Sequence, residues 1–513
     1  MFFLKVFSCF FVFNMGFKEL LEKRDFIFCF ELSPRQDTPK EWSFLEKAVE
    51  LGIIHAISVT ENLGGMPAVS PEFVASHLKE LPIPVILHFS CKDKNRNQIE
   101  SELLTLEKKG LLDLLIMTGD IPSSGYLGTP KPVFDLDAVQ CISLATLVSK
   151  KFFKGGVVNP FKVTCEETWL QYFKLYKKFF AGANFFITQS GFVPQKWKEL
   201  LDIKNFGITK IFADLFQDES LFNPERDAEF RKVPLLGSVI YPSSRIMDMI
   251  LDLKIPGILA SVKVYETIKK KTEKPIELVA KLCAILKGLG YNGVHLCGFP
   301  HNISRVKELQ DLFNKYLNKW KELFEELSSP VVYNKKREPV KKEFPLVFSK
   351  DKGIIHGLKP SFSFKFVFSH VFHECFFSKS SPLFPVLKPL ARLGNRFSLL
   401  RWIVTKQEYT IKKIIYDCKE CGECRLYDYN YNCPFGGCAK GLLNGPCGGS
   451  IEGFCEVYPF EKQCLYVKAV KTALSKKHIK KLLFPGKTPI TSPRNWKYSG
   501  SSSWLNFFLE NQT

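Results

Sequence analysis

The sequence of 513 residues contains no apolar run of the ~18–20 residues that span a bilayer, so we expect no membrane partner. It lacks the Gly-x-Gly-x-x-Gly fingerprint of a separate dinucleotide-binding domain. Its 72 Lys and Arg outnumber its 52 Asp and Glu, yet they form no recognisable nucleic-acid-binding motif, and no nucleic-acid partner is expected. Residues 1–14 imitate the apolar part of an export signal but lack a cleavage site. We therefore expect a cytoplasmic protein whose natural start is Met15, with residues 1–14 a dispensable or mis-annotated extension.

With 45% hydrophobic and 24% charged residues, the chain can bury a large core, and its length predicts two or three domains at ~150 residues each. The positive charge is unevenly distributed. Residues 1–310 hold 39 basic and 35 acidic residues, whereas residues 311–513 hold 33 basic and 17 acidic ones. A basic C-terminal part would suit docking of an acidic protein partner.

Short β-rich runs alternate with amphipathic stretches over the first 300 residues. Eight such runs predict a (β/α)₈ TIM barrel, and an open doubly wound sheet is the alternative. The predicted strands are 26–31, 54–60, 83–89, 112–118, 155–158, 185–189, 234–240 and 293–297, and the spacers with helical character include 41–51, 66–80, 97–109, 166–181, 275–289 and 303–327.

Polar residues stand at or just after the end of nearly every predicted strand. In a barrel these ends converge on one mouth, where the active site lies. A carboxyl in a poorly solvated mouth has a raised pKa and suits general acid chemistry, while a second carboxylate can stay ionised and stabilise a developing cation. We expect Glu31 and Asp120 to divide these roles. The full set is Glu31, Thr60, His88, Asp120, Asn159, Gln189, Ser238 and His295.

Half of the sixteen cysteines crowd into residues 418–464. Two-residue gaps let consecutive thiolates reach one metal centre, and eight ligands make two sets of four. The Cys-x-x-Cys-x-x-Cys opening favours an iron–sulfur cluster over zinc, with a disulfide knot as the remaining alternative. The eight predicted ligands are Cys418, Cys421, Cys424, Cys433, Cys438, Cys447, Cys455 and Cys464. The other eight cysteines are dispersed and are interpreted as small core residues.

These features predict five segments. They are an extension (1–14), a barrel (15–315), a helix end with an irregular linker (316–405), a cysteine-rich metal-binding domain (406–470) and a basic tail (471–513). The tail carries an apolar cluster at Trp504, Leu505, Phe507 and Phe508, which we expect to dock on the rest of the chain.

Several motifs in order along the barrel resemble the methylenetetrahydrofolate reductase family. They are FELSPR (30–35), ISVTEN (57–62), ILHFSC (86–91), IMTGD (116–120), KPVFDLD (131–137), VVNP (157–160) and AGANFFITQ (181–189). The segment from about residue 405 is similar to the cysteine-rich C-terminal domain fused to such reductases, most distinctively in NGPCGGSIEGFCEVYP (444–459).

The resemblance implies a flavin-dependent TIM barrel that reduces 5,10-methylenetetrahydrofolate to 5-methyltetrahydrofolate, in one-carbon metabolism and methionine biosynthesis. It makes Glu31 the general acid that helps open the imidazolidine ring of the folate. Asp120 would lie near flavin and pterin, and Gln189 would hydrogen-bond the folate. The residues that match flavin-contacting positions are Thr60, His88, Gly119, Asp120, Asn159 and Lys178.

Two positions depart from the family pattern. Thr118 stands where many members have an arginine, and Glu61 stands where an aromatic residue often follows Thr60. Both positions belong to the expected flavin site, so FMN could replace FAD. The two changes also argue against direct binding of NAD(P)H to the barrel. Electrons would come from NAD(P)H or from a ferredoxin-like donor or partner oxidoreductase through the cysteine-rich domain. A homo-oligomer is expected.

Two other functions are consistent with the same sequence. One is a pterin-binding barrel methyltransferase that passes a methyl group to a corrinoid. The other is a non-catalytic assembly or electron-transfer subunit whose barrel has lost its flavin. The presence of Glu31, Asp120 and Gln189 argues against the second, whereas Thr118 and Glu61 keep it open.

Overall fold

The fold is that of a computed structural model, which describes residues 15–34, 39–123, 125–252, 254–259, 262–328, 332–333, 339–340, 344–486 and 488–509. The predicted extension 1–14 lies outside these residues. The chain divides into two compact units at 357/358, and each is described by itself. Among the described residues, no helix is long and apolar enough to cross a membrane.

The first unit contains a closed barrel of eight parallel strands in sequential order, which confirms the predicted TIM barrel and excludes the open sheet. Alternation of buried strands with helices produces this closure, because each helix returns the chain to the same end of the sheet. The strands are β1 (Ile27–Leu32), β2 (Ala56–Val59), β3 (Val85–Ser90), β4 (Asp113–Met117), β5 (Phe153–Val158), β6 (Phe185–Ser190), β7 (Leu235–Ile240) and β8 (Gly293–Cys297).

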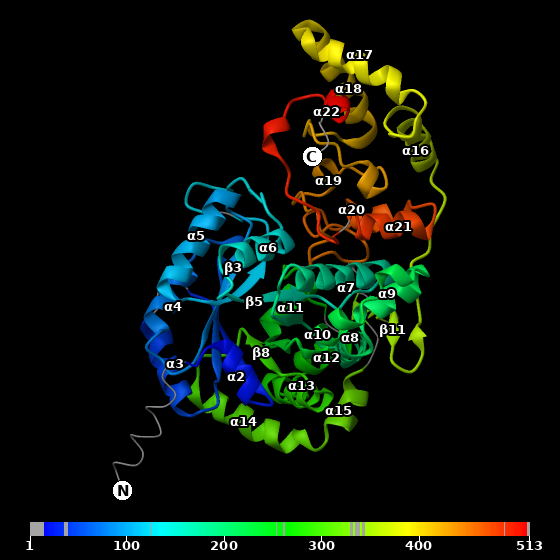
Figure 1. The fold of residues 1–513 in the computed structure, drawn as a ribbon. Coiled ribbons are helices and arrows are strands. Elements are labelled where there is room, and N and C mark those ends of the chain that lie inside the picture. The colour runs from blue at the N-terminus through cyan, green and yellow to red at the C-terminus, as the bar shows by residue number, and fades with distance from the viewer. Residues whose placement is uncertain are drawn as a thin grey trace. The chain divides into compact units, whose positions relative to one another are not determined.

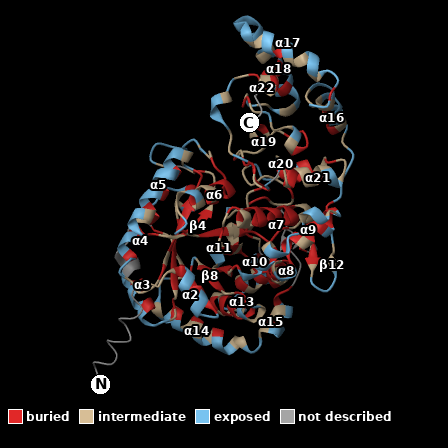
Figure 2. Cartoon of the chain, viewed as in Figure 1, coloured by how far each residue is buried: buried red, intermediate tan, exposed pale blue. Residues whose placement is uncertain are grey.

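Helices surround the strands in Figure 1, and Figure 2 shows buried residues along the strands and exposed ones on the outer helices. The helices of this unit are α2 (Phe17–Lys23), α3 (Pro39–Glu50), α4 (Pro71–Leu78), α5 (Arg96–Lys109), α6 (Ala138–Val148), α7 (Cys165–Phe180), α8 (Pro194–Phe206), α9 (Ile208–Phe216), α10 (Pro224–Lys232), α11 (Ser244–Leu251), α12 (Val262–Lys269), α13 (Pro275–Leu289), α14 (Ile303–Leu317) and α15 (Trp320–Leu327).

Helix α2 packs on the barrel core near the amino-terminal ends of the strands. Phe17 is fully buried, and its ring packs against those of Phe153 and Phe185, with distances of 6.1 and 5.0 Å between ring centroids. Its backbone N–H donates to the Asp113 carboxylate at 3.1 Å. Burial raises the pKa of Asp113 to about 6. Because α2 covers the amino-terminal ends of the strands, the carboxyl-terminal ends remain open for a functional site.

The segment predicted as irregular is more ordered than expected. Its first part belongs to the barrel unit. The backbone N–H groups of Val347 and Phe348 donate to Glu199 of α8, at 2.5 and 3.3 Å, and the Trp169 ring N–H donates to the His356 carbonyl at 2.6 Å. The prediction of an irregular linker after the helix end in residues 316–405 is wrong for 364–405, which is largely helical. The short strands before it are β9 (Val332–Tyr333), β10 (Pro339–Val340), β11 (Phe348–Ser349) and β12 (Gly353–Ile354).

The second unit combines three long helices with the cysteine-bearing loops. Its C-terminal helix packs on the long ones: Leu505 and Phe508 are buried with Ala391, beside Phe377 and Phe384, so the predicted docking of the tail is confirmed. The helices are α16 (Phe364–Phe376), α17 (Phe384–Arg396), α18 (Ser398–Tyr416), α19 (Pro434–Gly437), α20 (Leu465–Lys471), α21 (Lys476–Leu483) and α22 (Ser503–Leu509).

Candidate active site

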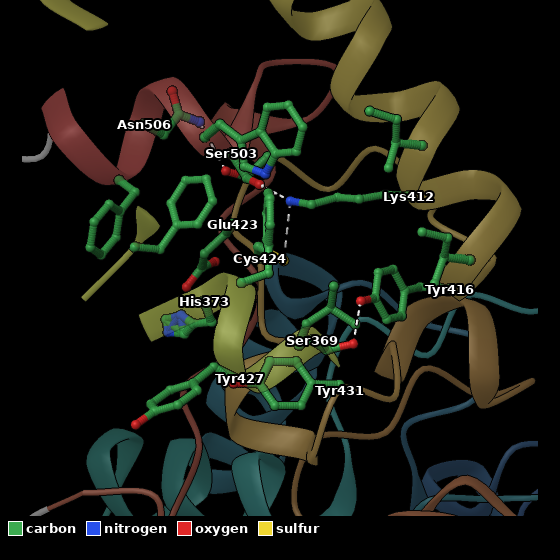
Figure 3. Close-up of a pocket in the computed structure, with 18 of the residues that line it drawn as sticks. Ser369, His373, Lys412, Tyr416, Glu423, Cys424, Tyr427, Tyr431, Ser503 and Asn506 are labelled. Carbon is green, nitrogen blue, oxygen red and sulfur yellow. Dashed lines mark hydrogen bonds between the residues drawn. The ribbon is translucent and has the colours of Figure 1, made fainter. Parts of the chain in front are cut away.

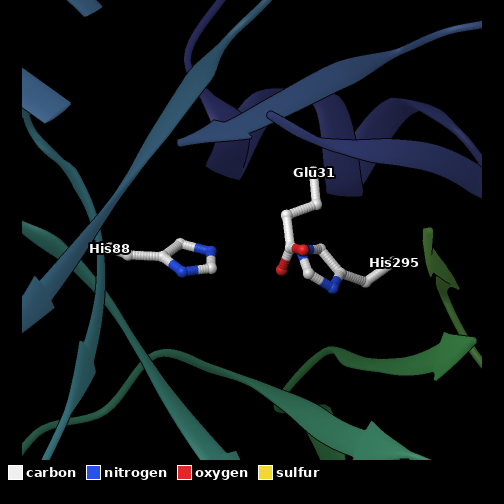
Figure 4. A group of neighbouring side chains, drawn as sticks. All are labelled: Glu31, His88 and His295. Carbon is white, nitrogen blue, oxygen red and sulfur yellow. The ribbon is translucent and has the colours of Figure 1, made fainter. Parts of the chain in front are cut away.

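The barrel mouth collects a carboxylic acid and two imidazoles from three strands. Glu31 near the end of β1, His88 of β3 and His295 of β8 place one ligand atom each within 4.8 Å of one another. Figure 4 shows the Glu31 carboxylate beside His295 and facing His88. His88 and His295 are buried, whereas Glu31 is half-buried and so remains reachable from the mouth.

Among the described residues, no cation pairs with the Glu31 carboxylate. Loss of solvation raises the pKa of Glu31 from 4.5 to about 7, an effect that the hydrogen bond from Cys297 partly offsets. Burial lowers the pKa of His88 to about 3 and that of His295 to about 4, so both rings are neutral at pH 7. Glu31 is therefore partly protonated near neutral pH and can act as a general acid.

A network of thiol and hydroxyl groups fixes the acid and one imidazole. The Cys297 thiol donates to Glu31 Oε2 at 3.4 Å and lies 3.3 Å from His295 Nδ1. Ser58 Oγ lies 2.7 Å from His295 Nε2, and Ser238 Oγ lies 3.3 Å from Nδ1. The interpretation of Cys297 as a small core residue is therefore wrong. It stands two residues after His295 on the same strand face, which is the sequence signal that could have found it.

A carboxylate with two imidazoles is also a ligand set for divalent transition metals. Here both ring nitrogens of His295 already have hydroxyl partners. We interpret the group as a hydrogen-bonded acid site, because binding an ion would require one of these bonds to break.

The buried His88 ring has one unused nitrogen. Its Nε2 has no hydrogen-bond partner among the described residues. Leaving such an atom unpaired in a buried place costs free energy, so a bound group that supplies a partner is favoured there. A flavin fits this requirement, since its ring edge carries donors and acceptors.

The loop after β4 brings Gly119 and Asp120 to the same end of the barrel. Gly119 has φ +87°, and a Cβ at this position would lie 2.8 Å from Ser90 Oγ. Only glycine meets both conditions without strain. Asp120 is half-buried, and Thr118 before it is buried.

Four other predicted residues lie on or after β2, β5, β6 and α7. Thr60 is buried, and its backbone N–H donates to the Leu32 carbonyl at 3.0 Å. Gln189 donates to the Pro256 carbonyl at 3.3 Å, and Asn159 donates to the Gly257 carbonyl at 2.9 Å. Both amides therefore hold the loop after α11. The buried Lys178 ammonium bonds to the Val157 carbonyl, and burial lowers the pKa of Lys178 to about 7.

The departure at Glu61 has a structural explanation. One Glu61 oxygen accepts from the Ser90 backbone N–H at 2.5 Å, and the other pairs with Lys94 at 2.6 Å. Lys94 also pairs with Glu102 at 2.6 Å. Glu61 thus ties the end of β2 to the end of β3.

In the second unit, all eight predicted cysteine ligands are free thiols, so the structure has no disulfide among them. Among the described residues, no three of these thiols lie within 4.8 Å of one another, the spacing that a single zinc ion needs. An iron–sulfur cluster is larger than a single ion, so its cysteine sulfurs can lie farther apart.

The thiols interact electrically in two groups. Burial raises the pKa of Cys418, Cys421 and Cys433, and the charge of Cys424 raises each further. Burial also raises the pKa of Cys438 and Cys447. The charge of Cys455 raises the pKa of Cys438 further, and the charges of Cys464 and Cys438 raise that of Cys447. The charges that act on these thiols thus come from within the first four cysteines for one group and from within the last four for the other.

A cavity of about 330 Å³ opens beside the first group (Figure 3). Cys424 lines it together with rings that include His373, Tyr427 and Trp504. The Lys412 ammonium lies 3.6 Å from the Cys424 sulfur and donates to Glu408 at 2.6 Å. A thiolate at this position would therefore face a buried cation.

Comparison with known proteins identifies both units. The family model described as methylenetetrahydrofolate reductase matches residues 16–307, and the one described as methylene-tetrahydrofolate reductase C terminal matches residues 399–496. No curated protein matches the chain.

Solved structures show weaker likenesses. A 2,3-dimethylmalate lyase of the PEP mutase/isocitrate lyase superfamily is 11% identical over 60% of this chain and 84% of its own, with a TM-score of 0.32. A putative deoxyribose-phosphate aldolase from Toxoplasma gondii ME49 is 12% identical over 61% of this chain and 99% of its own, with a TM-score of 0.31. Neither likeness bears on function. The first family model covers more than half of the chain, so the chain belongs to the methylenetetrahydrofolate reductase family and is an oxidoreductase of that activity.

Proposed function

We propose that the barrel reduces 5,10-methylenetetrahydrofolate to 5-methyltetrahydrofolate with a bound flavin, and that Glu31 is its general acid. The observation that carries this proposal is the half-buried Glu31 carboxyl in the barrel mouth, whose pKa is raised to about 7 beside two neutral imidazoles. An acid with a pKa near the working pH is the most effective proton donor.

Glu31 would deliver a proton to a nitrogen of the folate imidazolidine ring. The bond between that nitrogen and the methylene carbon then breaks, and its electron pair stays on the nitrogen. The methylene carbon becomes part of an iminium ion, which accepts a hydride and forms the methyl group. Bound reduced flavin would supply this hydride. The Asp120 carboxylate would stabilise the positive charge of the iminium, and Gln189 would hydrogen-bond the folate.

The proposed flavin contacts are Thr60, His88, Gly119, Asp120, Asn159 and Lys178. Two observations support them: the unpaired His88 Nε2, and the buried Lys178 ammonium at the β5 carbonyl row. FAD is the family's usual flavin. FMN remains an alternative because Thr118 replaces an arginine and Glu61 is engaged with Lys94.

The cysteine-rich unit is proposed to bind metal in two sets of four thiolates. One set is Cys418, Cys421, Cys424 and Cys433, and the other is Cys438, Cys447, Cys455 and Cys464. The Cys-x-x-Cys-x-x-Cys opening favours iron–sulfur clusters over zinc, and so does the observation that no three described thiols lie within 4.8 Å of one another. Clusters would pass electrons from a ferredoxin-like donor or partner oxidoreductase to the flavin, whereas zinc would leave NAD(P)H as the donor. A cytoplasmic location and a homo-oligomer complete the proposal.

An anaerobic visible spectrum of the purified chain, with iron and zinc analysis, tests this proposal. We expect flavin bands and a broad iron–sulfur absorption with about eight irons per chain if both sets hold four-iron clusters. Flavin with zinc alone would refute the relay and leave the reductase. A protein that binds no flavin after reconstitution would refute the reductase mechanism and favour the methyltransferase or the non-catalytic subunit.

A further inference from the structure

The helical pair α17–α18 carries apolar side chains that the described residues of its own unit leave exposed. Six large side chains are each 52–66% exposed: Val386, Leu390, Leu393, Phe397, Leu399 and Trp402. We call this set the apolar tip. A monomeric protein exposes single apolar side chains routinely, but six within a stretch of seventeen residues indicate an interaction surface.

The pattern has helical order. Val386, Leu390 and Leu393 follow one another at steps of four and three residues, which places them along one side of α17, and Phe397 follows directly after the end of this helix. The opposite side of α17 is already packed, because Ala391 is buried with Leu505 and Phe508 of α22. The helix therefore has two apolar sides, and its own unit covers one.

The chain segment that carries the apolar tip has charges of one sign, although Glu420 from farther along the chain lines a cavity together with Arg401 and Trp402. Residues 375–407 contain six basic residues and no acidic one. Arg392, Arg396 and Arg401 are exposed and have no acidic partner among the described residues. A second copy of this surface would bring like charges together, so self-association through it is disfavoured.

We propose that the apolar tip and its basic residues bind the surface of an anionic lipid bilayer. A negative bilayer surface satisfies all the cations at once, while the apolar side chains enter the boundary of the acyl region. Long basic side chains can bend towards the headgroups as the apolar ones insert. An acidic protein would need an apolar surface of matching shape beside its carboxylates, whereas a fluid bilayer offers both layers without a fixed geometry. Since no described helix can span a membrane, the contact is with the surface.

This proposal departs from the expectation of no membrane partner, which rested on the absence of spanning runs. Periodicity alone could not separate the two apolar sides of α17. The structure distinguishes them, because the side with Ala391 is buried against α22 and the side with Leu390 and Leu393 is exposed.

Vesicle binding by the full chain tests the proposal. Sedimentation with vesicles of phosphatidylcholine and phosphatidylserine at seven to three, in ~0.1 M salt, should capture the protein, and vesicles of phosphatidylcholine alone should capture much less. The variant R392Q/R396Q/R401Q should bind on the order of 100-fold more weakly. The variant L390S/L393S should lose at least about tenfold. All five residues are exposed, so both variants should keep the size and thermal midpoint of the parent.

Matched controls come from the first unit. L104S/L147S removes two exposed leucines, and K307Q/K319Q/K321Q removes three exposed charges. Both should bind vesicles like the parent. The proposal is overturned if the parent does not bind anionic vesicles, or if the tip variants bind as well as the controls. It is also overturned if the arginine variant loses binding to an acidic ferredoxin while its vesicle binding is unchanged, or if the tip variants only dissociate an oligomer.

Discussion

Replacing Glu31 with glutamine removes the proposed acid and keeps the shape of the side chain. Because Glu31→Gln cannot donate a proton, reduction of the folate should slow by roughly 10²–10⁴-fold. Reduction of the bound flavin should be unchanged, since no proton from Glu31 is needed in that half-reaction. In the parent, folate reduction should fall as the pH rises through about 7, where Glu31 loses its proton.

The same substitution should alter stability in a defined direction. The pKa of Glu31 is raised from 4.5 to about 7 in the folded chain, so the folded state binds this proton more tightly than the unfolded state. The parent therefore loses stability as the pH rises from about 4.5 to about 7. At about 1.36 kcal/mol per pH unit, the loss is about 3 kcal/mol. Glu31→Gln has no such ionisation, so its stability relative to the parent should rise by about this amount between pH 4.5 and pH 8.

Two assays check these effects, single-turnover mixing of reduced protein with the folate and denaturant unfolding at pH 4.5 and pH 8. The matched control is Asp113→Asn, which removes another carboxyl of raised pKa, at the amino-terminal end of β4. It should change stability and leave the folate half-reaction within a few-fold of the parent. If Glu31→Gln reduces the folate at the parent rate, or if its relative stability does not change with pH, the assignment of Glu31 as a general acid of raised pKa is wrong.

Three further predictions concern other residues. Because the Cys297 thiol lowers the pKa of Glu31, Cys297→Ala should move the alkaline fall of the folate rate to higher pH, and an unmoved profile would contradict the contact. Cys424→Ser should lose about half of the bound iron, while Cys375→Ser, an exposed thiol outside both sets, should lose none by metal analysis. Gly422→Ala should lower the stability of the second unit by at least about 2 kcal/mol in calorimetry. The reason is that Gly422 has φ +72° and that a Cβ there would lie 1.9 Å from a backbone carbonyl oxygen. A variant as stable as the parent would refute this close packing.

Much of the barrel could be predicted from the sequence, because the alternation of strands and helices and the positions of polar residues at strand ends can be recognised along the chain. Eight buried runs alternate with helices, and the polar residues at their ends include Glu31, His88 and His295, which the structure brings together. The roles of their neighbours could not be predicted. Cys297 resembles any small core residue until its strand is placed beside β1, and Glu61 resembles a changed flavin contact until Lys94 is seen to pair with it.

The second unit was harder to predict for a different reason. Its helices contain prolines, including Pro389 inside α17, and large apolar residues on more than one side. These features hide helical periodicity, and residues 364–405 therefore resembled an irregular linker. The proposed cysteine ligands could be listed from the sequence because their spacing is local in the chain.

The central claim is that this barrel converts methylenetetrahydrofolate through a bound flavin. The most direct test is to photoreduce the flavin-loaded protein without oxygen, mix it with 5,10-methylenetetrahydrofolate and follow the flavin absorbance and the folate product. The account predicts that the flavin is reoxidised in a single turnover and that one equivalent of 5-methyltetrahydrofolate forms for each flavin. A flavin that stays reduced, with the folate unchanged, would contradict it.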